Sequence, residues 1–491
     1  MLTKSLTVRL RSFVGRASAC AGLQSRSAWP TLSGGQATRR ELLLKSGQGF
    51  GAVALAGMLN AAPEKPTKAK SIIYLFMHGG VSHVDTFDPK PELQKRSGQP
   101  LSIELAKTIK TSFIHDPTKA ILRGSPWEFK PGGKSGLPVS DLYPHLRQRA
   151  DDIAVVRSCF SDVFDHAPAI YLRNSGSQFP GRPCLGSWLS YGLGTANKNL
   201  PSFVVMSDGS TKSGPVAYGA GFLPAKFQGT VFRGGENPIL YLRTPDGIKE
   251  GTQKETLDFI QQMDRIHQSQ HTADSTLDAR IASYELAYRM QSSAPEAVDI
   301  TKETDATKAL YGIGETRTDD FGRKCLLARR LVERGVRFIQ IYSGTNVGDD
   351  WDQAHEDLVG SHTKMAGKTD KPIAGLLADL KSRGLLDETL VVWGGEFGRT
   401  PLSQGKTGRD HHPYGYSMWL AGGGIKGGQA IGATDDFGVQ ATEMRVDSHD
   451  VNATLLRLMG IDHEKLTYFY QGRDMRLTDV HGFGEFTRKL V

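Results

Sequence analysis

Cysteine is scarce in this sequence, whose 491 residues include only Cys20, Cys159, Cys184 and Cys325. Their wide spacing provides neither the paired ligands of a cysteine-based metal site nor the framework of a disulfide-stapled fold. Cys20 falls in the N-terminal leader described below. We expect the other three to be small, buried apolar residues.

An excess of positive charge is also missing from most of the chain. The formal net charge is +8, but residues 1–70 contain 11 Lys or Arg and 2 Asp or Glu, a net of +9. The remaining residues therefore carry a net charge of −1. Because the residues after position 70 carry no excess of positive charge, there is no electrostatic reason to expect a nucleic-acid partner.

A long uninterrupted apolar run is absent as well. The run from Gly49 to Leu59 is too short and too rich in Gly and Ala for a membrane-spanning helix, so we expect no stable membrane span. It follows the pattern TRRELLLK at 38–45 and precedes small residues at 61–62. The segment resembles a twin-arginine export signal, although a disordered basic N-terminus is the alternative. We assign 1–62 as a signal region, with the twin-arginine translocase as its partner and the periplasm or the cell exterior as its destination.

Apolar strands that alternate with helices set the expected fold. The apolar run 71–77 ends at HGG (78–80), which is typical of a buried parallel strand that opens into a glycine turn. Further strands are expected at 152–158, 200–206, 336–342 and 389–393, and helices at 259–293, 320–335, 372–383 and 447–459. This alternation predicts an α/β fold with a doubly wound, mostly parallel sheet flanked by helices. We see no repeat or linker and expect one large domain over 71–489.

In such a sheet, ligands bind beyond the carboxyl ends of the strands. The residues that follow four of the expected strands are rich in imidazole and carboxylate groups: His78, Asp85, His166, Asp352, His355, Glu396 and His411. One such residue is usually a cap or turn residue, but four strand ends together favour a metal site. Mixed nitrogen and oxygen ligands suit zinc, manganese or iron better than calcium. We expect a divalent metal, zinc or manganese before calcium, and leave the number of ions open.

Several motifs are similar to those of one protein family. They are HGG at 78–80, DTFDPKP at 85–91, WD at 351–352 with His355, GEFGRTP at 395–401, GRDH at 408–411, GRD at 472–474 and RLTDVHG at 476–482. Over 71–489 the chain resembles a family of exported proteins of unknown function that is placed in the alkaline phosphatase and sulfatase superfamily. The resemblance implies an alkaline phosphatase-like fold.

The wider superfamily implies roles for single residues. Glu396 stands where its members have an acidic metal ligand, and His411 where they have a later histidine ligand. Asp352 and His355 resemble its Asp-x-x-x-His pair with one residue fewer between them. The alternatives are a buried ion pair for Glu396 and His411, and helix capping for Asp352 and His355.

The nucleophile position departs from the superfamily pattern. Sulfatases place a Cys or Ser two residues before a Pro, and His166 occupies this position before Pro168. Imidazole can attack, transfer protons or bind metal, and the sequence leaves these roles open beside that of a helix-start neighbour. His78 stands where the superfamily has an aspartate. Either Asp85 or Asp88 substitutes for it, or the site holds one metal ion instead of two. The alternative for His78 is a polar residue that closes the strand, and the alternative for Asp85 is a turn residue.

Arg399 and Arg409 are the expected anion-binding residues, because guanidinium matches the geometry of phosphate and sulfate. Pairing with nearby carboxylates is the alternative. We expect an exported, metal-dependent hydrolase of sulfate or phosphate esters, whose substrate is a sulfated or phosphorylated small molecule or glycan, polysaccharides included. A catalytically inactive exported binding or surface protein that keeps the fold is the alternative.

Overall fold

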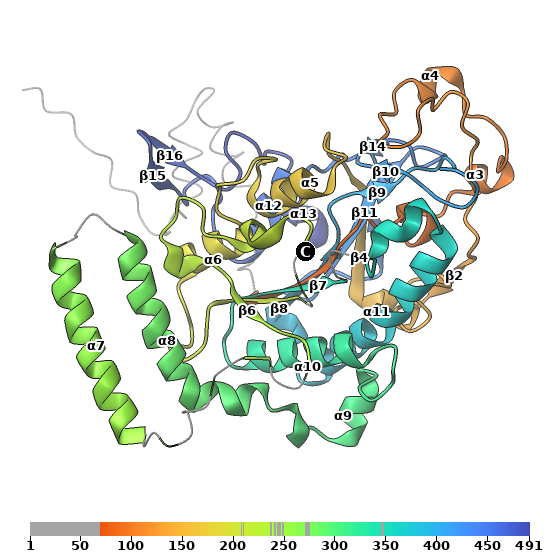
Figure 1. Ribbon diagram of the computed structural model, residues 1–491. Coiled ribbons are helices and arrows are strands. Elements are labelled where there is room, and N and C mark those ends of the chain that lie inside the picture. The colour runs from red at the N-terminus through yellow and green to blue at the C-terminus, as the bar shows by residue number, and fades with distance from the viewer. Residues whose placement is uncertain are drawn as a thin grey trace, which may run out of the picture. The chain divides into compact units, whose positions relative to one another are not determined.

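An eight-stranded β-sheet runs through the centre of the described part of the chain (Figure 1). The computed structural model describes residues 69–491, apart from 208, 210, 236–237, 240–241, 243–246, 248–249, 271–274 and 345–347. These residues belong to one unit, Pro66–Val491. The expected signal region, 1–62, and the twin-arginine pattern in it lie outside the described residues.

The central sheet and several short hairpins contain the strands. The sheet consists of β1 Ser71–Met77, β4 Ile153–Cys159, β5 Phe203–Met206, β6 Thr230–Phe232, β7 Phe338–Ser343, β8 Thr389–Gly394, β11 Tyr416–Ala421 and β12 Gln429–Ile431. The hairpins are β2 Phe129–Gly132 with β3 Leu137–Ser140, β9 Gly398–Arg399 with β10 His411–His412, β13 Ala433–Thr434 with β14 Ala441–Glu443, and β15 Tyr468–Tyr470 with β16 Arg473–Met475.

The helices cover the sheet and extend beyond it. They are α3 Pro91–Lys95, α4 Ile103–Ala106, α5 His166–Ser175, α6 Leu185–Leu193, α7 Glu250–Gln270, α8 Ser275–Val298, α9 Asp305–Leu310, α10 Asp319–Glu333, α11 Leu358–Ser382, α12 Ser448–Leu458 and α13 Thr487–Leu490. A short 3-10 helix, η6 Trp351–His355, follows β7.

The strand order is β12-β4-β11-β8-β1-β7-β5-β6. β11 runs antiparallel to both of its neighbours, and the other neighbouring pairs are parallel. The start of β11 therefore lies at the same edge as the ends of β4 and β8, with Tyr416 opposite Cys159. A mostly parallel sheet flanked by helices confirms the predicted fold class.

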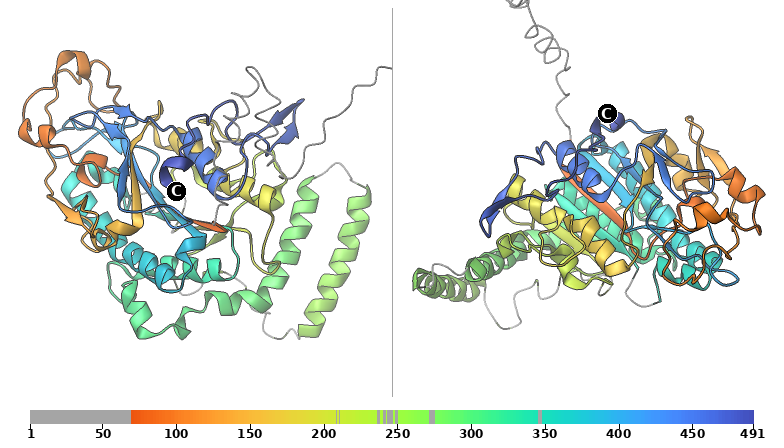
Figure 2. Two further views of the ribbon diagram at one scale, coloured as in Figure 1. Left: turned by 180° about the vertical axis from the view of Figure 1, so that it is seen from behind. Right: turned by 90° about the horizontal axis from the view of Figure 1, so that it is seen from above.

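The two faces of β1 show why the central strands are apolar throughout. Ile73 and Leu75 pack in a core cluster with residues of α10 and α11. Ile72 and Phe76 pack in a second cluster with residues of α6 and α12. Figure 2 shows these helices on opposite faces of the sheet. A strand that is covered on both faces has no solvent-facing positions, which explains its continuous apolar sequence.

Two helical segments differ from their expected boundaries. The expected helix at 259–293 corresponds to two helices, α7 and α8, which lie side by side (Figure 1). No Gly or Pro stands in HTAD at 271–274 to mark a boundary in the sequence. Helix α11 begins at Leu358, not at Pro372, and contains this proline. Burial of Ile373 and Leu377 holds the helix in place beyond it.

Two simpler expectations can also be compared with the structure. Cys159, Cys184 and Cys325 are buried and free, as predicted. In the part of the chain that the structure describes, no helix is long and apolar enough to cross a membrane.

Candidate metal centre

The connection between β8 and β11 begins and ends at one edge of the sheet, because these two strands are antiparallel. Within it, β9 and β10 pair so that Arg399 lies opposite His411. Arg399 is fully buried and His411 is 4% exposed. The antiparallel pairing therefore brings a guanidinium and an imidazole, twelve positions apart in sequence, together at the carboxyl end of β8.

Helix η6 supplies Asp352 and His355 to the same edge. Its start is capped by Asp350, whose Oδ1 accepts the N–H of Asp352 at 3.1 Å, so the side chain of Asp352 is not the cap. Gly79, just after β1, has a φ of +111°, and a Cβ on it would lie 2.6 Å from the nitrogen of Asp352. Glycine at position 79 therefore allows η6 to pack against the end of β1.

His166 is the first residue of α5. Its Nδ1 lies 2.6 Å from Glu396 Oε1, and this oxygen also accepts the N–H of Gly79 at 2.9 Å. The side chain of Glu396 is fully buried. Glu396 therefore lies behind His166, where it fixes the orientation of the imidazole ring.

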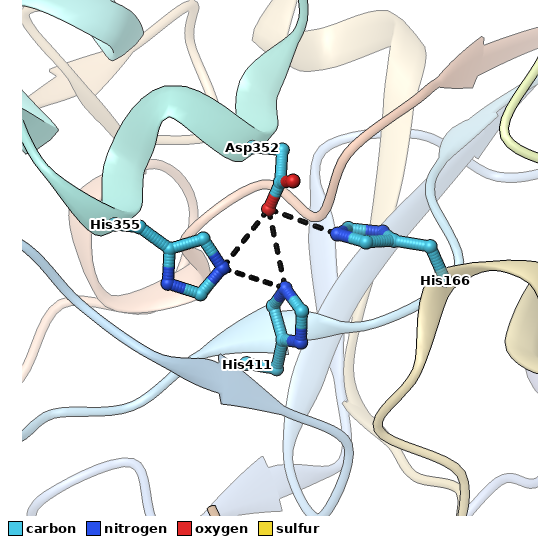
Figure 3. Close-up of side chains that lie close together, drawn as sticks. All are labelled: His166, Asp352, His355 and His411. Carbon is cyan, nitrogen blue, oxygen red and sulfur yellow. Dashed lines mark hydrogen bonds and ion pairs between the residues drawn. The ribbon is translucent and has the colours of Figure 1, made fainter. Parts of the chain in front are cut away.

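Four of the predicted residues converge on one point: His166, Asp352, His355 and His411 (Figure 3). Each offers one ligand atom, and these atoms lie within 4.8 Å of one another. Asp352 Oδ1, His355 Nε2 and His411 Nε2 form a triangle with sides of 2.8, 3.1 and 3.2 Å. Ligands of a tetrahedral zinc ion are roughly 3.3 Å apart, given zinc–ligand bonds of about 2.0 Å. The triangle therefore has nearly the size of one face of a metal coordination sphere.

Hydrogen bonds orient two of the imidazoles for metal binding. His355 Nδ1 faces Gln404 Oε1 at 2.6 Å, just as His166 Nδ1 faces Glu396 Oε1. Because both oxygens are acceptors, we assign the proton of each ring to Nδ1, which leaves a lone pair on Nε2. His166 Nε2 lies 2.8 Å from Asp352 Oδ1 but has no hydrogen-bond partner of acceptable geometry. Ligand atoms that lie this close together fit a shared cation.

The charge states of Asp352 and His411 agree with this fit. Burial raises the pKa of Asp352, but three neighbouring histidines and the charge of Arg399 hold it well below its usual range. Burial lowers the pKa of His411 to about 2. At neutral pH the pair therefore offers an ionised carboxylate and a neutral imidazole, which are the forms that bind metal.

The family described as "Protein of unknown function (DUF1501)" matches residues 69–484. The chain belongs to this family. The match confirms the resemblance that the sequence motifs indicated. No curated protein matches the sequence.

Several solved structures are similar to this DUF1501 chain. A sulfatase from Pseudoalteromonas sp. is 14% identical over 88% of this chain and 75% of its own, with a TM-score of 0.35. An alkaline phosphatase from the Antarctic bacterium TAB5 is 10% identical over 81% of this chain and 99% of its own, also with a TM-score of 0.35. They are of the types to which the sequence motifs pointed, but at these TM-scores the similarity carries no argument about function.

Arg399 contacts the cluster directly. It donates to Asp352 Oδ1 at 2.8 Å and to His355 Nε2 at 3.1 Å. It also donates to the carbonyl oxygens of Gly79 and Gly80. The pairing with a carboxylate that the sequence offered as an alternative is therefore present in this DUF1501 chain, at the edge of the cluster.

Besides Arg399 and the predicted ligand Glu396, three predicted residues lie outside the four-residue cluster. Arg409 donates to both carboxylate oxygens of Asp85, at 2.8 and 3.2 Å, and both residues are fully buried. Arg409 thus also has the carboxylate partner that the sequence offered as its alternative. His78 Nε2 accepts the N–H of Lys212 at 3.0 Å, while its Nδ1 is buried without a hydrogen-bond partner.

Several residues at the cluster were not predicted, among them Lys212 and Phe113. Lys212 Nζ pairs with Asp352 Oδ2, and lies 3.3 Å from Asp350 Oδ2. The ring centroid of Phe113 lies 4.5 Å from that of His355. Lys212 follows β5, so a search after every expected strand, extended to lysine, would have found it. Phe113 lies in an irregular segment, for which the sequence holds no comparable signal.

Proposed function

We propose that this chain is a metal-dependent hydrolase of phosphate or sulfate esters. The observation that carries the proposal is the triangle of Asp352 Oδ1, His355 Nε2 and His411 Nε2, whose sides are close to the distances between the ligands of one metal ion. Beside it stands His166, which Glu396 orients. Three residues would thus hold a divalent cation, and a fourth presents a lone pair to the same position. The nitrogen-rich donor set suits zinc or manganese better than calcium.

A divalent cation bound there would polarise an ester oxygen and lower the pKa of a water molecule. We assign His166 as the general base. Its Nε2 accepts a proton from the attacking water, whose oxygen bonds to phosphorus or sulfur while the ester oxygen leaves and takes up a proton as the alcohol. Burial raises the pKa of Glu396, but its hydrogen bond with His166 leaves that pKa lowered. An ionised Glu396 at Nδ1 then stabilises the imidazolium that forms at His166.

Lys212 is the cation that we assign to the substrate anion. Its side chain is 16% exposed, whereas the side chains of Arg399 and Arg409 are fully buried. Arg409 is engaged by Asp85, so its positive charge is already balanced. Arg399 adds a fixed positive charge next to Asp352. Because solvent reaches the ammonium group of Lys212, this group can release the carboxylate of Asp352 and bind a phosphate or sulfate oxygen instead.

The proposal extends to substrate and location. The motif resemblance supports a sulfated or phosphorylated small molecule or glycan as the substrate. The pattern TRRELLLK at 38–45 supports export by the twin-arginine route to the periplasm or the cell exterior. Export is tested by cell fractionation: we expect Arg39→Lys/Arg40→Lys to retain the chain in the cytoplasm, and export of this variant would contradict the route.

The test of the function is turnover of a panel of sulfate and phosphate esters by the metal-loaded chain. We expect the parent to turn over at least one ester class. His166→Ala should keep its metal and lose about 100-fold or more in kcat, because a general base contributes about 10²–10⁴-fold. His481→Ala, an exposed histidine, should match the parent.

Other outcomes separate the alternatives. Loss of metal from His166→Ala would make this histidine a ligand and overturn its role as base. A metal-loaded parent without turnover of any ester would leave an exported binding protein as the better account.

A further inference from the structure

The segment 111–114 reaches over two histidines of the cluster. The centroid of the Phe113 ring lies 4.5 Å from that of His355 and 5.9 Å from that of His411, in edge-to-face geometry. Ser112 Oγ lies 3.3 Å from His411 Nδ1. Phe113 itself is 56% exposed. A large apolar side chain therefore borders the cluster on one side and solvent on the other.

Asp410 fixes this segment in place. Its Oδ2 accepts the N–H groups of Phe113 at 2.7 Å and Ile114 at 2.9 Å. Its Oδ1 accepts the N–H of His411 at 2.7 Å, and the residue is fully buried. Hydrogen bonds from backbone N–H groups to a buried carboxylate are strong and directional. The position of the Phe113 backbone is thus set by the residue that precedes His411 in the chain.

Solvent reaches some members of the cluster but not the residues buried behind them. Arg399 and Glu396 are 0% and 1% exposed. The side chains of Asp352 and His355 keep 19% and 14% of their surface exposed. An ester that binds by its anionic group must leave its organic group on the exposed side. Phe113, in contact with His355, is an apolar surface on that side.

We propose that Phe113 is a specificity-determining residue, which makes the site prefer esters of ring-shaped groups over esters of small alkyl groups. The ring-shaped group of such a substrate is an aryl group or a sugar with an apolar face. This inference rests on the proposed hydrolase function. Aromatic contacts add to binding beyond simple burial of area, and a methyl ester is too small to cover the Phe113 ring. Single exposed apolar residues are common, but Phe113 differs in being anchored by Asp410 against two cluster histidines.

The test compares phenyl, glucosyl and methyl phosphates and sulfates as substrates of the metal-loaded full chain. Phe113→Ala should lower kcat/KM about tenfold for the ring-shaped esters, mainly through KM, and less than about twofold for the methyl ester. Phe113→Tyr should restore the preference. Phe179→Ala, which removes a phenylalanine that is 67% exposed, should behave as the parent. The phenyl and glucosyl esters show which ring the site accepts.

Binding without turnover gives an independent readout. We expect the affinity for phenylphosphonate to fall about tenfold in Phe113→Ala, while that for methylphosphonate stays within about twofold, as measured by titration calorimetry. An unchanged ratio between the two ligands, with turnover intact, would overturn the role of Phe113 alone. A metal-loaded parent that neither binds nor hydrolyses any of these compounds would overturn the hydrolase function and this inference with it.

Discussion

Glu396 Oε1 and His166 Nδ1 lie 2.6 Å apart, and the same oxygen accepts the N–H of Gly79 at 2.9 Å. One carboxylate oxygen thus joins the segments that follow β1 and β8 to the first residue of α5. It also sets the tautomer of His166, so that Nε2 presents its lone pair to the cluster. The relationship makes Glu396 a positioning residue for His166.

Replacing this carboxylate tests its role. We expect Glu396→Gln to lower kcat about 100-fold or more, because the neutral amide no longer stabilises the imidazolium of His166. KM and metal content should stay near those of the parent, since neither residue belongs to the Asp352–His355–His411 triangle. Glu464→Gln, at an exposed position, is the control. Steady-state kinetics with unchanged kcat in Glu396→Gln would contradict the assignment.

The close approach of η6 to β1 predicts a difference between two glycines. Gly79→Ala and Gly98→Ala both place a side chain at positive φ, which costs roughly 1–2 kcal/mol. At Gly79 the new Cβ would also meet the nitrogen of Asp352 at 2.6 Å, whereas at Gly98 no atom lies within 4 Å. Overpacking adds roughly 1–3 kcal/mol at Gly79 alone. Denaturant unfolding should therefore show a larger loss of stability for Gly79→Ala than for Gly98→Ala, and Gly79→Ala should also bind less metal. Equal losses of stability in the two variants would argue against this packing.

The Asp85–Arg409 pair predicts a stability effect without metal loss. Both residues are fully buried, so Asp85→Asn leaves the charge of Arg409 without its partner, which typically costs about 3–5 kcal/mol. The exposed pair Lys70–Glu388 is the control, because Glu388→Gln should change stability by less than about 1 kcal/mol. Unfolding curves measure the stability of each variant, and elemental analysis measures its metal content. Stoichiometric loss of metal from folded Asp85→Asn would instead make Asp85 a ligand.

His362 predicts a loss of stability in acid. Its Nε2 accepts the N–H of Ser82 at 3.0 Å, and burial lowers its pKa to about 3. In the unfolded chain the pKa returns to about 6.5. Below pH 6.5 the unfolded state therefore binds a proton that the folded state does not, and stability falls by roughly 1.4 kcal/mol per pH unit until the pH approaches 3.

A glutamine at position 362 separates this histidine from other titrating groups. Its Oε1 can still accept the N–H of Ser82, but it does not titrate. Between pH 7 and pH 5 the parent should lose roughly 2 kcal/mol more than His362→Gln, as measured by urea unfolding. The same pH dependence in both proteins would show that His362 is protonated in the folded state or is not buried.

Much of the fold and the cluster could be predicted from the sequence, because they depend on local patterns. β1 is apolar throughout since both faces are covered, and strand ends carry the ligand residues in an α/β sheet. Partners across the fold could not be predicted. Nothing in the sequence indicates that Glu396 faces His166 or that Arg409 faces Asp85, because these pairs form by packing between distant segments. Phe113 belongs to a segment without periodicity, and its backbone is held by Asp410, which is distant in the sequence.

The central claim, a metal held by Asp352, His355 and His411, is tested most directly by elemental mass spectrometry of the purified chain. The chain is expressed with zinc and manganese supplied, beside Asp352→Ala, His411→Ala and the exposed control Asp387→Ala. We expect stoichiometric metal in the parent and in Asp387→Ala, and its loss from folded Asp352→Ala and His411→Ala. A parent without bound metal, or folded cluster variants that keep it, would contradict the claim.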